Sequence, residues 1–170
     1  MRRLAHLLSA AVLVLFATNA LAQPQTEARD ATPCRKDAPE KVAVPHDFSI
    51  VHRSGPTHAD WGTTWIKSVN AAGLATVKQV RPIRGRGGPR EEKSQQKQLS
   101  KQAVEHLYAQ VVGCDFFALN TSYWNRRVMD GWSSSLEVTA SGKKHNVVEH
   151  HFAVARLSAI VRALNEAVDK

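Results

Sequence analysis

The stretch that decides the fold is LSKQAVEHLYAQVVGCDFFAL, residues 99–119. Ser100 can accept a hydrogen bond from a free amide of a first helical turn, and Leu99 and Val104 occupy the two positions of a hydrophobic staple. Apolar residues then recur at helical spacing on one face until Gly113, a residue type that often ends helices. The pattern predicts an amphipathic helix that is followed by an apolar anchor driven into the core, formed by Phe116, Phe117 and Leu119.

Upstream of this helix, the first segment with strand periodicity is residues 47–53. It places Phe48, Ile50 and His52 on one face of an extended chain, because successive side chains of a strand point to opposite sides. The Ser-Gly-Pro sequence at residues 54–56 is expected to break the strand.

Two further strands are predicted before the helix. Residues 61–69 are rich in β-branched and aromatic side chains, which favours a strand with Trp61 and Trp65 on one face and one of them in the core. Residues 70–73 end in a glycine that is free to adopt positive φ, so we expect a hairpin turn there. Residues 74–80 then return as the third strand.

Downstream of the helix, residues 120–131 form a polar connection with two aromatic side chains. Residues 132–140 and 143–150 have strand character and flank a Ser-Gly turn, so they predict a second antiparallel pair. A final amphipathic helix is expected from about Ala153, with an apolar stripe at helical spacing.

The predicted order is therefore β-β-β-α-β-β-α, and the predicted fold class is α+β. Each helix has a single apolar stripe to bury, so we expect an antiparallel sheet that is packed on one face by two helices. Residues 47–170 form one such domain, interrupted by a basic segment at residues 81–98. Apolar residues are almost absent from this segment after Ile83, so it is interpreted as a flexible loop.

Residues 1–22 have the order of a secretory signal peptide. Arg2 and Arg3 precede an apolar run over residues 7–17, and Ala-Leu-Ala then ends at Ala22. We expect cleavage after Ala22 and a periplasmic or secreted protein. The apolar run is shorter than the about 20 residues of a spanning helix, so no transmembrane anchor is expected.

After cleavage, residues 23–46 form an extended leader that contains Cys34, and the second cysteine is Cys114. An isolated pair of cysteines in an oxidising compartment usually forms a disulfide, which would tie the leader to the domain. The alternative is two unpaired thiols, with Cys114 filling space in the core.

The mature chain is basic, with 21 Lys and Arg side chains against 15 Asp and Glu, a net charge of +6. This balance suits an anionic envelope surface or an acidic protein as partner. Arg84 and Arg86 are the candidate contacts within the basic loop, and a merely solvated loop is the alternative. The loop lacks an aromatic side chain on which a base could stack, so no nucleic acid partner is expected.

A second candidate binding surface follows the helix. Tyr123 and Trp124 stand next to Arg126 and Arg127 in the polar connection. Aromatic and arginine side chains are enriched where proteins recognise partners, so these four residues predict an exposed binding rim. Packing at the edge of the sheet is the alternative.

No residue pattern in the chain specifies catalysis, a metal ion or a cofactor. The Gly-x-Ser-x-Gly motif of serine hydrolases is absent from the sequence. His145 and His151 would share a strand face, yet they would lie about 20 Å apart and could not bind one ion. We therefore predict no catalytic residues, no metal site and no cofactor.

Several local sequences resemble those of a family of small secreted bacterial domains of unassigned function. The similar parts are the Ser54-Gly55 turn, the turn at residues 70–73, Leu99-Ser100, and the run at residues 114–119. A Ser-Gly turn and a final amphipathic helix follow, so the resemblance spans residues 47–170. It implies the same fold, without a biochemical role.

The chain also resembles emfourin, a small protein inhibitor of thermolysin-type metalloproteases, in the Ser54-Gly55 turn and the strand-then-helix layout. That resemblance implies inhibition of an extracytoplasmic metalloprotease, although a second glycine after Gly55 is missing. The favoured interpretation is a secreted or periplasmic binding domain without catalytic activity. Inhibition of a metalloprotease and hydrolysis by histidine and carboxylate groups are the two alternatives.

Overall fold

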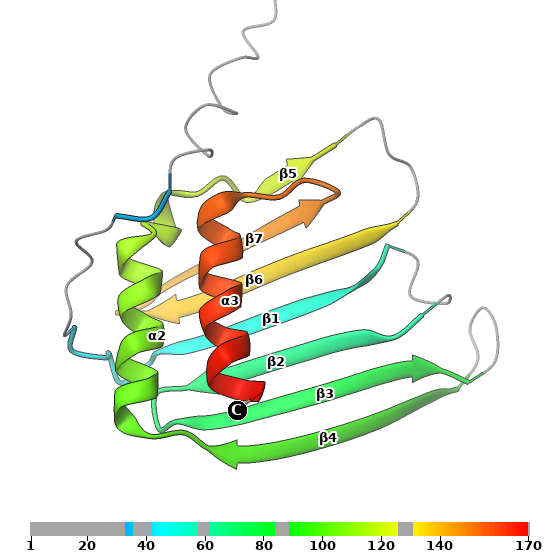
Figure 1. Ribbon diagram of the computed structural model, residues 1–170, viewed down its shortest axis with the longest axis horizontal. Coiled ribbons are helices and arrows are strands. Elements are labelled where there is room, and N and C mark those ends of the chain that lie inside the picture. The colour runs from blue at the N-terminus through cyan, green and yellow to red at the C-terminus, as the bar shows by residue number, and fades with distance from the viewer. Residues whose placement is uncertain (1–32, 36–41, 58–61, 84–88, 126–130, 170) are drawn as a thin grey trace, which may run out of the picture.

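The structure is a computed structural model, and it describes residues 33–35, 42–57, 62–83, 89–125 and 131–169. The expected signal peptide and most of the expected leader lie outside the described residues. Within them, seven strands form one sheet, and two helices pack on one of its faces (Figure 1). The predicted α+β class and the two-layer arrangement are therefore confirmed.

Strands occur in the order β4-β3-β2-β1-β6-β7-β5 across the sheet. Every neighbouring pair is antiparallel except β5 and β7, which are parallel, so the sheet is mixed. The strands are β1 (Ser49–Pro56), β2 (Thr64–Asn70), β3 (Leu74–Pro82), β4 (Arg90–Gln98), β5 (Ser122–Trp124), β6 (Trp132–Ala140) and β7 (Lys143–His150).

Helix α2 (Lys101–Gly113) forms where the sequence predicts it. The Ser100 side chain caps the helix by accepting a hydrogen bond of 3.2 Å from the Ala103 amide. The helix ends at Gly113, although the residue that adopts the left-handed conformation is Asp115, with φ of 49°. This reversal leads into η1 (Phe116–Ala118), a short 3-10 turn that buries the Phe116 ring.

Helix α3 (Ala155–Asp169) begins two residues later than the expected Ala153. The delay has a local cause, because the Glu149 carboxylate accepts a hydrogen bond of 2.7 Å from the Val154 amide just before the helix. The buried side of α3 faces the sheet, as its apolar stripe predicts. It consists of Leu157, Ile160, Leu164 and Val168.

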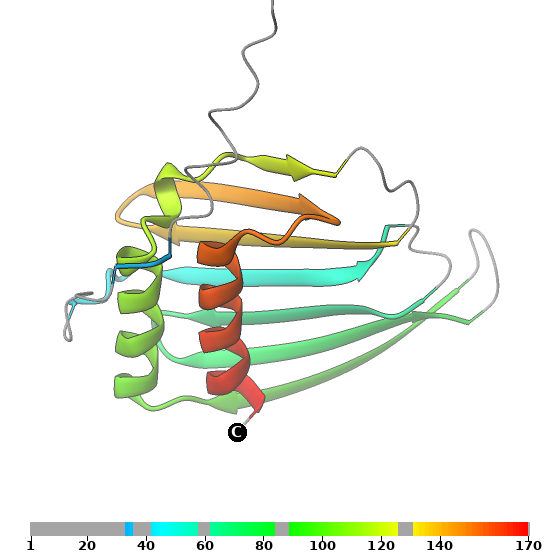
Figure 2. The same cartoon turned by 45° about the horizontal axis from the view of Figure 1, so that its top comes forward.

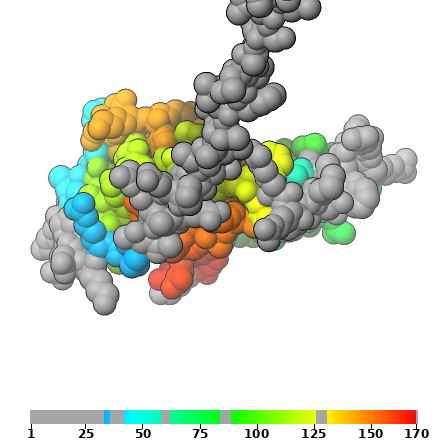
Figure 3. Space-filling model, turned by 90° about the horizontal axis from the view of Figure 1, so that it is seen from above, coloured from blue at the N-terminus to red at the C-terminus, as the bar shows by residue number. Residues whose placement is uncertain are grey.

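The core lies between this side of the sheet and the two helices. Its largest fully buried side chains come from the strands, from the residue before β1, from η1 and from both helices, and include Phe48, Ile50, Leu107, Phe116, Leu136, Leu157, Ile160 and Leu164. Figure 2 shows both helices on the same side of the sheet from another direction, and Figure 3 shows the red C-terminal end of α3 protruding from the molecule. Among the described residues, no helix lies on the opposite face of the sheet.

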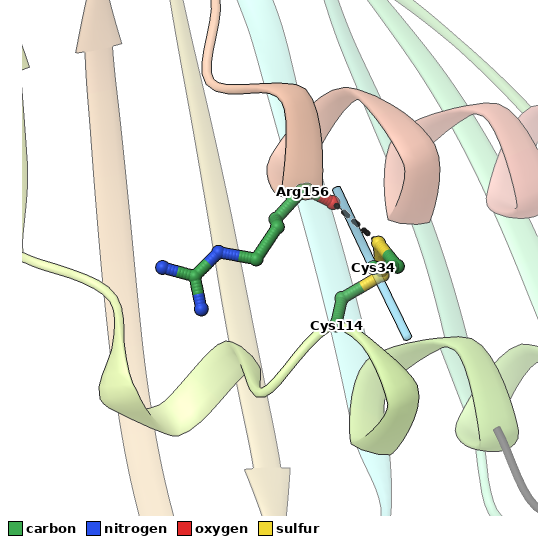
Figure 4. The surroundings of a disulfide bond; sticks show 3 residues. All are labelled: Cys34, Cys114 and Arg156. Atoms are coloured by element: carbon green, nitrogen blue, oxygen red, sulfur yellow. Dashed lines mark hydrogen bonds between the residues drawn. A yellow bond between two sulfur atoms is a disulfide. The ribbon is translucent and has the colours of Figure 1, made fainter. Parts of the chain in front are cut away.

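The predicted disulfide between Cys34 and Cys114 is present, with the two Cα atoms 4.2 Å apart (Figure 4). The Arg35 amide also donates to the Gly113 carbonyl at 3.0 Å, so the leader is held at the end of α2 by a covalent and a backbone link. Cys34 Sγ lies 3.9 Å from the Arg156 carbonyl oxygen. A bonded sulfur has no hydrogen to donate, so this approach is a packing contact between the leader and α3.

The expectation of a flexible loop over residues 81–98 is wrong for most of that range. Arg81 and Pro82 belong to β3, and residues 90–98 form strand β4, which pairs with β3 along its whole length. The strand lacks an apolar face because it lies at the edge of the sheet and both its sides are exposed. Its pairing comes from backbone hydrogen bonds, which hydrophobic periodicity does not report.

Two smaller expectations about the strands are also wrong. The Ser-Gly-Pro sequence does not break β1, which continues to Pro56 because it pairs with β6 up to Trp132. A proline is tolerated there because it occupies the last position of the strand. The connection after η1 contains β5, a three-residue strand that is too short to give a periodic signal. The antiparallel five-strand sheet is thus corrected to a mixed seven-strand sheet.

Candidate functional site

One end of the sheet is left uncovered by the helices. Figure 1 shows α2 and α3 crossing the same half of the sheet, while the other half extends beyond α3. At this uncovered end β1 stops at Pro56, β2 starts at Thr64, β6 starts at Trp132 and β5 stops at Trp124. We call these strand ends the bare end of the sheet.

Three tryptophan side chains lie exposed at the bare end. Trp65 is 38% exposed, Trp132 is 51% exposed and Trp124 is 64% exposed. The pairing registers place Trp65 and Trp132 on the helix side of the sheet, on β2 and β6, either side of β1. Trp65 pairs with Ser54 and Trp132 pairs with Pro56, so the two residues are two strands apart and offset by two residues along the strands, or about 12 Å. Trp124 points to the other face, where its ring lies 4.8 Å from that of His150.

The structure tests only part of the predicted binding rim. Trp124 is exposed, but Tyr123 is buried, and its hydroxyl oxygen accepts a hydrogen bond of 2.9 Å from the Asn120 amide. Neighbouring residues of a strand point to opposite faces of the sheet. Tyr123 therefore points into the core, whereas Trp124 points to solvent. The expectation that both aromatic side chains are exposed is therefore wrong for Tyr123. Arg126 and Arg127 lie outside the described residues.

The arginine contacts expected in the basic loop, Arg84 and Arg86, also lie outside the described residues. Trp61 also lies outside the described residues. Trp65, the other tryptophan expected on that strand face, is exposed and is not a core residue.

A cleft lies beside α3, where the helix side of the sheet emerges towards the bare end. It has a volume of about 370 Å³, and we call it the α3 cleft. Small-molecule sites begin at about this size. Strands β1, β2 and β3 and the last two turns of α3 provide its lining, which is His52, Ser54, Trp65, Lys67, Val77, Asn165 and Asp169.

His52 forms the buried part of this lining, with 7% of its surface exposed. Its Nε2 shares a hydrogen bond of 3.0 Å with the Ser134 hydroxyl of the neighbouring strand. Burial lowers the pKa of His52 to about 4, and the positive charge of Lys67 on β2 adds to the effect. The imidazole is therefore neutral at pH 7.

The charged groups of the α3 cleft neutralise each other. Lys67 Nζ lies 2.8 Å and 2.7 Å from the two carboxylate oxygens of Asp169, so the ammonium bridges β2 to the end of α3. Asn165, one turn earlier on the helix, has a buried Oδ1 without a hydrogen-bond partner among the described residues. The cleft thus combines a neutral ion pair, an unsatisfied amide oxygen and an aromatic ring.

Acidification is expected to destabilise the protein through His52. The folded-state pKa of about 4 lies below the ordinary value of 6.5, so the unfolded chain binds the proton first as the pH falls. The free energy of unfolding should fall by about 2.5 kcal/mol between pH 7.5 and 4.5 from this group alone. Urea denaturation at the two pH values measures the loss.

The matched control for this prediction is His52→Gln, which should lose about 2.5 kcal/mol less than the wild type over the same pH range. Glu149 titrates with the opposite sense, because burial raises its pKa, and it contributes equally to both proteins. Equal losses in the two proteins would contradict the assignment to His52.

No group of three or more His, Cys, Asp or Glu side chains within the described ranges is arranged to hold a metal ion. His150 and His151 are adjacent on the chain and belong to different surroundings. The His150 ring contacts that of Trp124 at a tilt of 37°, whereas the His151 ring packs against Gly131, where a Cβ atom would clash with it. These histidines therefore have structural contacts. The Glu149 carboxylate accepts its hydrogen bond from the Val154 amide, just before α3.

Sequence reasoning missed most of the α3 cleft. Alternation in β1 places His52 on the core face with Phe48 and Ile50, which was a usable signal. Lys67 lies opposite His52 only because of the hairpin register, and Asn165 and Asp169 arrive from a helix about a hundred residues away. Long-range packing, which no local pattern encodes, brings these groups together.

No protein-family model matches the chain, and no curated protein has a similar sequence. The resemblances to a secreted family and to emfourin therefore stay predictions.

Proposed function

We propose that this protein is a non-catalytic binding domain that acts outside the cytoplasm and contacts its partner through the bare end of the sheet. The observation that carries the proposal is the gathering of three exposed tryptophan rings at one end of one sheet. The core between the sheet and the two helices is complete without these three rings. Core packing therefore does not explain why tryptophan occupies these positions. Tryptophan is the residue type most enriched among side chains that dominate binding energy.

The location outside the cytoplasm is supported by two independent features. Residues 1–22 have the order of a signal peptide, and Cys34 and Cys114 form a disulfide that would not persist in a reducing cytosol. Neither α2 nor α3, nor any other helix among the described residues, is long and apolar enough to span a membrane.

One observation favours the hydrolase alternative, namely the hydrogen bond between His52 and Ser134. A serine nucleophile needs a base that is poised near the working pH, and a histidine with a pKa of about 4 is a weak one. Ser134 is the single hydrogen-bond partner of His52 among the described residues, so no carboxylate there orients the ring. The pair therefore suits a structural role in the wall of the α3 cleft.

The proposal is tested by comparing what three immobilised proteins retain from the envelope and secreted fractions of the source organism. These are the wild type, a triple variant with Trp65, Trp124 and Trp132 replaced by alanine, and Leu74→Ala. Leu74 is as exposed as Trp65, but it lies at the opposite end of β3 and serves as the control. Retention should fall at least about tenfold in the triple variant only, as expected when anchor residues are removed.

Thermal unfolding of the three proteins must show equal midpoints, so that a loss of retention reports the surface and not the fold. If the triple variant retains the same components as the wild type, the bare end is not the contact surface.

A further inference from the structure

The α3 cleft has the chemistry of a site for an uncharged ligand. Its cation and its anion, Lys67 and Asp169, are paired through both carboxylate oxygens at 2.7–2.8 Å. His52 is neutral because burial lowers its pKa. Since the two charges satisfy each other, the described lining residues give neither an anion nor a cation an unpaired opposite charge to bind. The cleft therefore offers polarity without net charge.

The polar groups of the cleft still have hydrogen-bonding capacity to offer. The Asp169 side chain is 58% exposed, and a carboxylate has about four acceptor positions, of which the ammonium occupies two. Asn165 is partly exposed and lines the cleft, although its Oδ1 atom is itself buried, and the Ser54 hydroxyl can donate or accept. A ligand with several hydroxyl groups matches this set, because each hydroxyl both donates and accepts.

The remaining lining is apolar and flat. Trp65 contributes a partly exposed indole ring, and Val77 on β3, which pairs with Lys67, also lines the cleft. A ring of this kind buries a large apolar area against a flat partner at little entropic cost. The ligand that has one apolar ring face and a rim of hydroxyls is a sugar.

We propose that the α3 cleft binds one uncharged sugar residue of a glycan, with its apolar face on Trp65 and its hydroxyls on Asp169, Asn165 and Ser54. The volume of about 370 Å³ limits the cleft to a small group, so the rest of the glycan extends from it. Trp132, about 12 Å away on the same face, lies in the path of a chain that leaves towards β6. This inference rests on the proposed binding function and assigns a ligand class to part of the bare end.

The test is a calorimetric titration of the oxidised, mature protein with four neutral tetrasaccharides. These are the tetramer of N-acetylglucosamine and the β-1,4, α-1,4 and β-1,3 tetramers of glucose. At least one should bind with a Kd below about 10 mM, since single-sugar sites with one stacking ring are weak. Trp65→Ala and Asn165→Leu should each weaken that binding about tenfold or more.

Leu74→Ala is the matched control, because it removes a side chain as exposed as Trp65 that lies at the opposite end of β3, outside the bare end. Its sugar affinity should stay within about twofold of the wild type. The inference is overturned if none of the four sugars binds, or if the sugar that binds does so equally well after Trp65→Ala and Asn165→Leu.

The two proposals fail in different ways. If the sugars do not bind while retention of an envelope component still depends on the three tryptophan residues, only the ligand class is wrong. If both readouts are insensitive to these residues, the bare end is not a binding surface.

Discussion

Replacing both Cys34 and Cys114 with serine is expected to lower the free energy of unfolding by about 4 to 5 kcal/mol. The disulfide joins residues that are 80 positions apart, and a cross-link of that span removes much of the conformational freedom of the unfolded chain. Urea denaturation of the oxidised wild type and of the double variant measures the difference. For a domain of this size, the loss is a large part of the total stability.

Treatment of the wild type with a thiol-free reductant is the control, and it should give the same loss without a change of sequence. A double variant within about 1 kcal/mol of the oxidised wild type would show that the leader contributes little to folding. The Arg35 backbone bond to Gly113 would then have to hold the leader without covalent help.

The second large effect is expected from Phe116→Ala, which should destabilise the protein by about 3 to 5 kcal/mol. Phe116 is fully buried between α2 and the sheet, and its ring lies 5.7 Å from that of Phe117 and 5.4 Å from that of His145. Truncation would leave a cavity in a dense part of the core. The measurement is again the free energy of unfolding in urea.

Phe117→Ala is the matched control, because it removes the same side chain from the next position, where the ring is only partly buried. It should cost clearly less than Phe116→Ala, since partial burial leaves less apolar area to lose. Equal costs for the two variants would mean that η1 does not orient the two rings as described.

The sequence predicted the elements that depend on local signals. Ser100, Gly113 and the apolar spacing between them defined α2, and the turns at Gly73 and at Ser141 and Gly142 gave the two hairpins. Both turns require positive φ, and the residues present supply it. The disulfide also followed, because two cysteines in an exported chain leave one possible partner each.

The elements that were missed depend on pairing and not on composition. Strand β4 is polar on both faces, and it forms because the chain after Pro82 returns to an available edge of the sheet. Strand β5 spans three residues and exists because it lies beside β7. That pairing also sets which way Tyr123 and Trp124 point. The predicted binding rim was therefore wrong at Tyr123 for the same reason.

The candidate site shows the same limit more strongly. The tryptophan residues could be counted from the sequence. Their gathering at one end of the sheet depends on where β2, β5 and β6 start and stop. The ion pair between Lys67 and Asp169 spans 102 positions in the chain. The α3 cleft, which both residues line, exists only because α3 packs across the sheet.

NMR of the tryptophan indoles determines whether the bare end of the sheet is the contact surface. Each indole N–H gives a separate signal, and the Trp65, Trp124 and Trp132 signals are assigned by single substitution. On titration with the retained envelope component, we expect these three signals to shift, while backbone signals of the exposed sides of α2 and α3 do not. Shifts confined to the helices, with the three indole signals unchanged, would contradict this expectation.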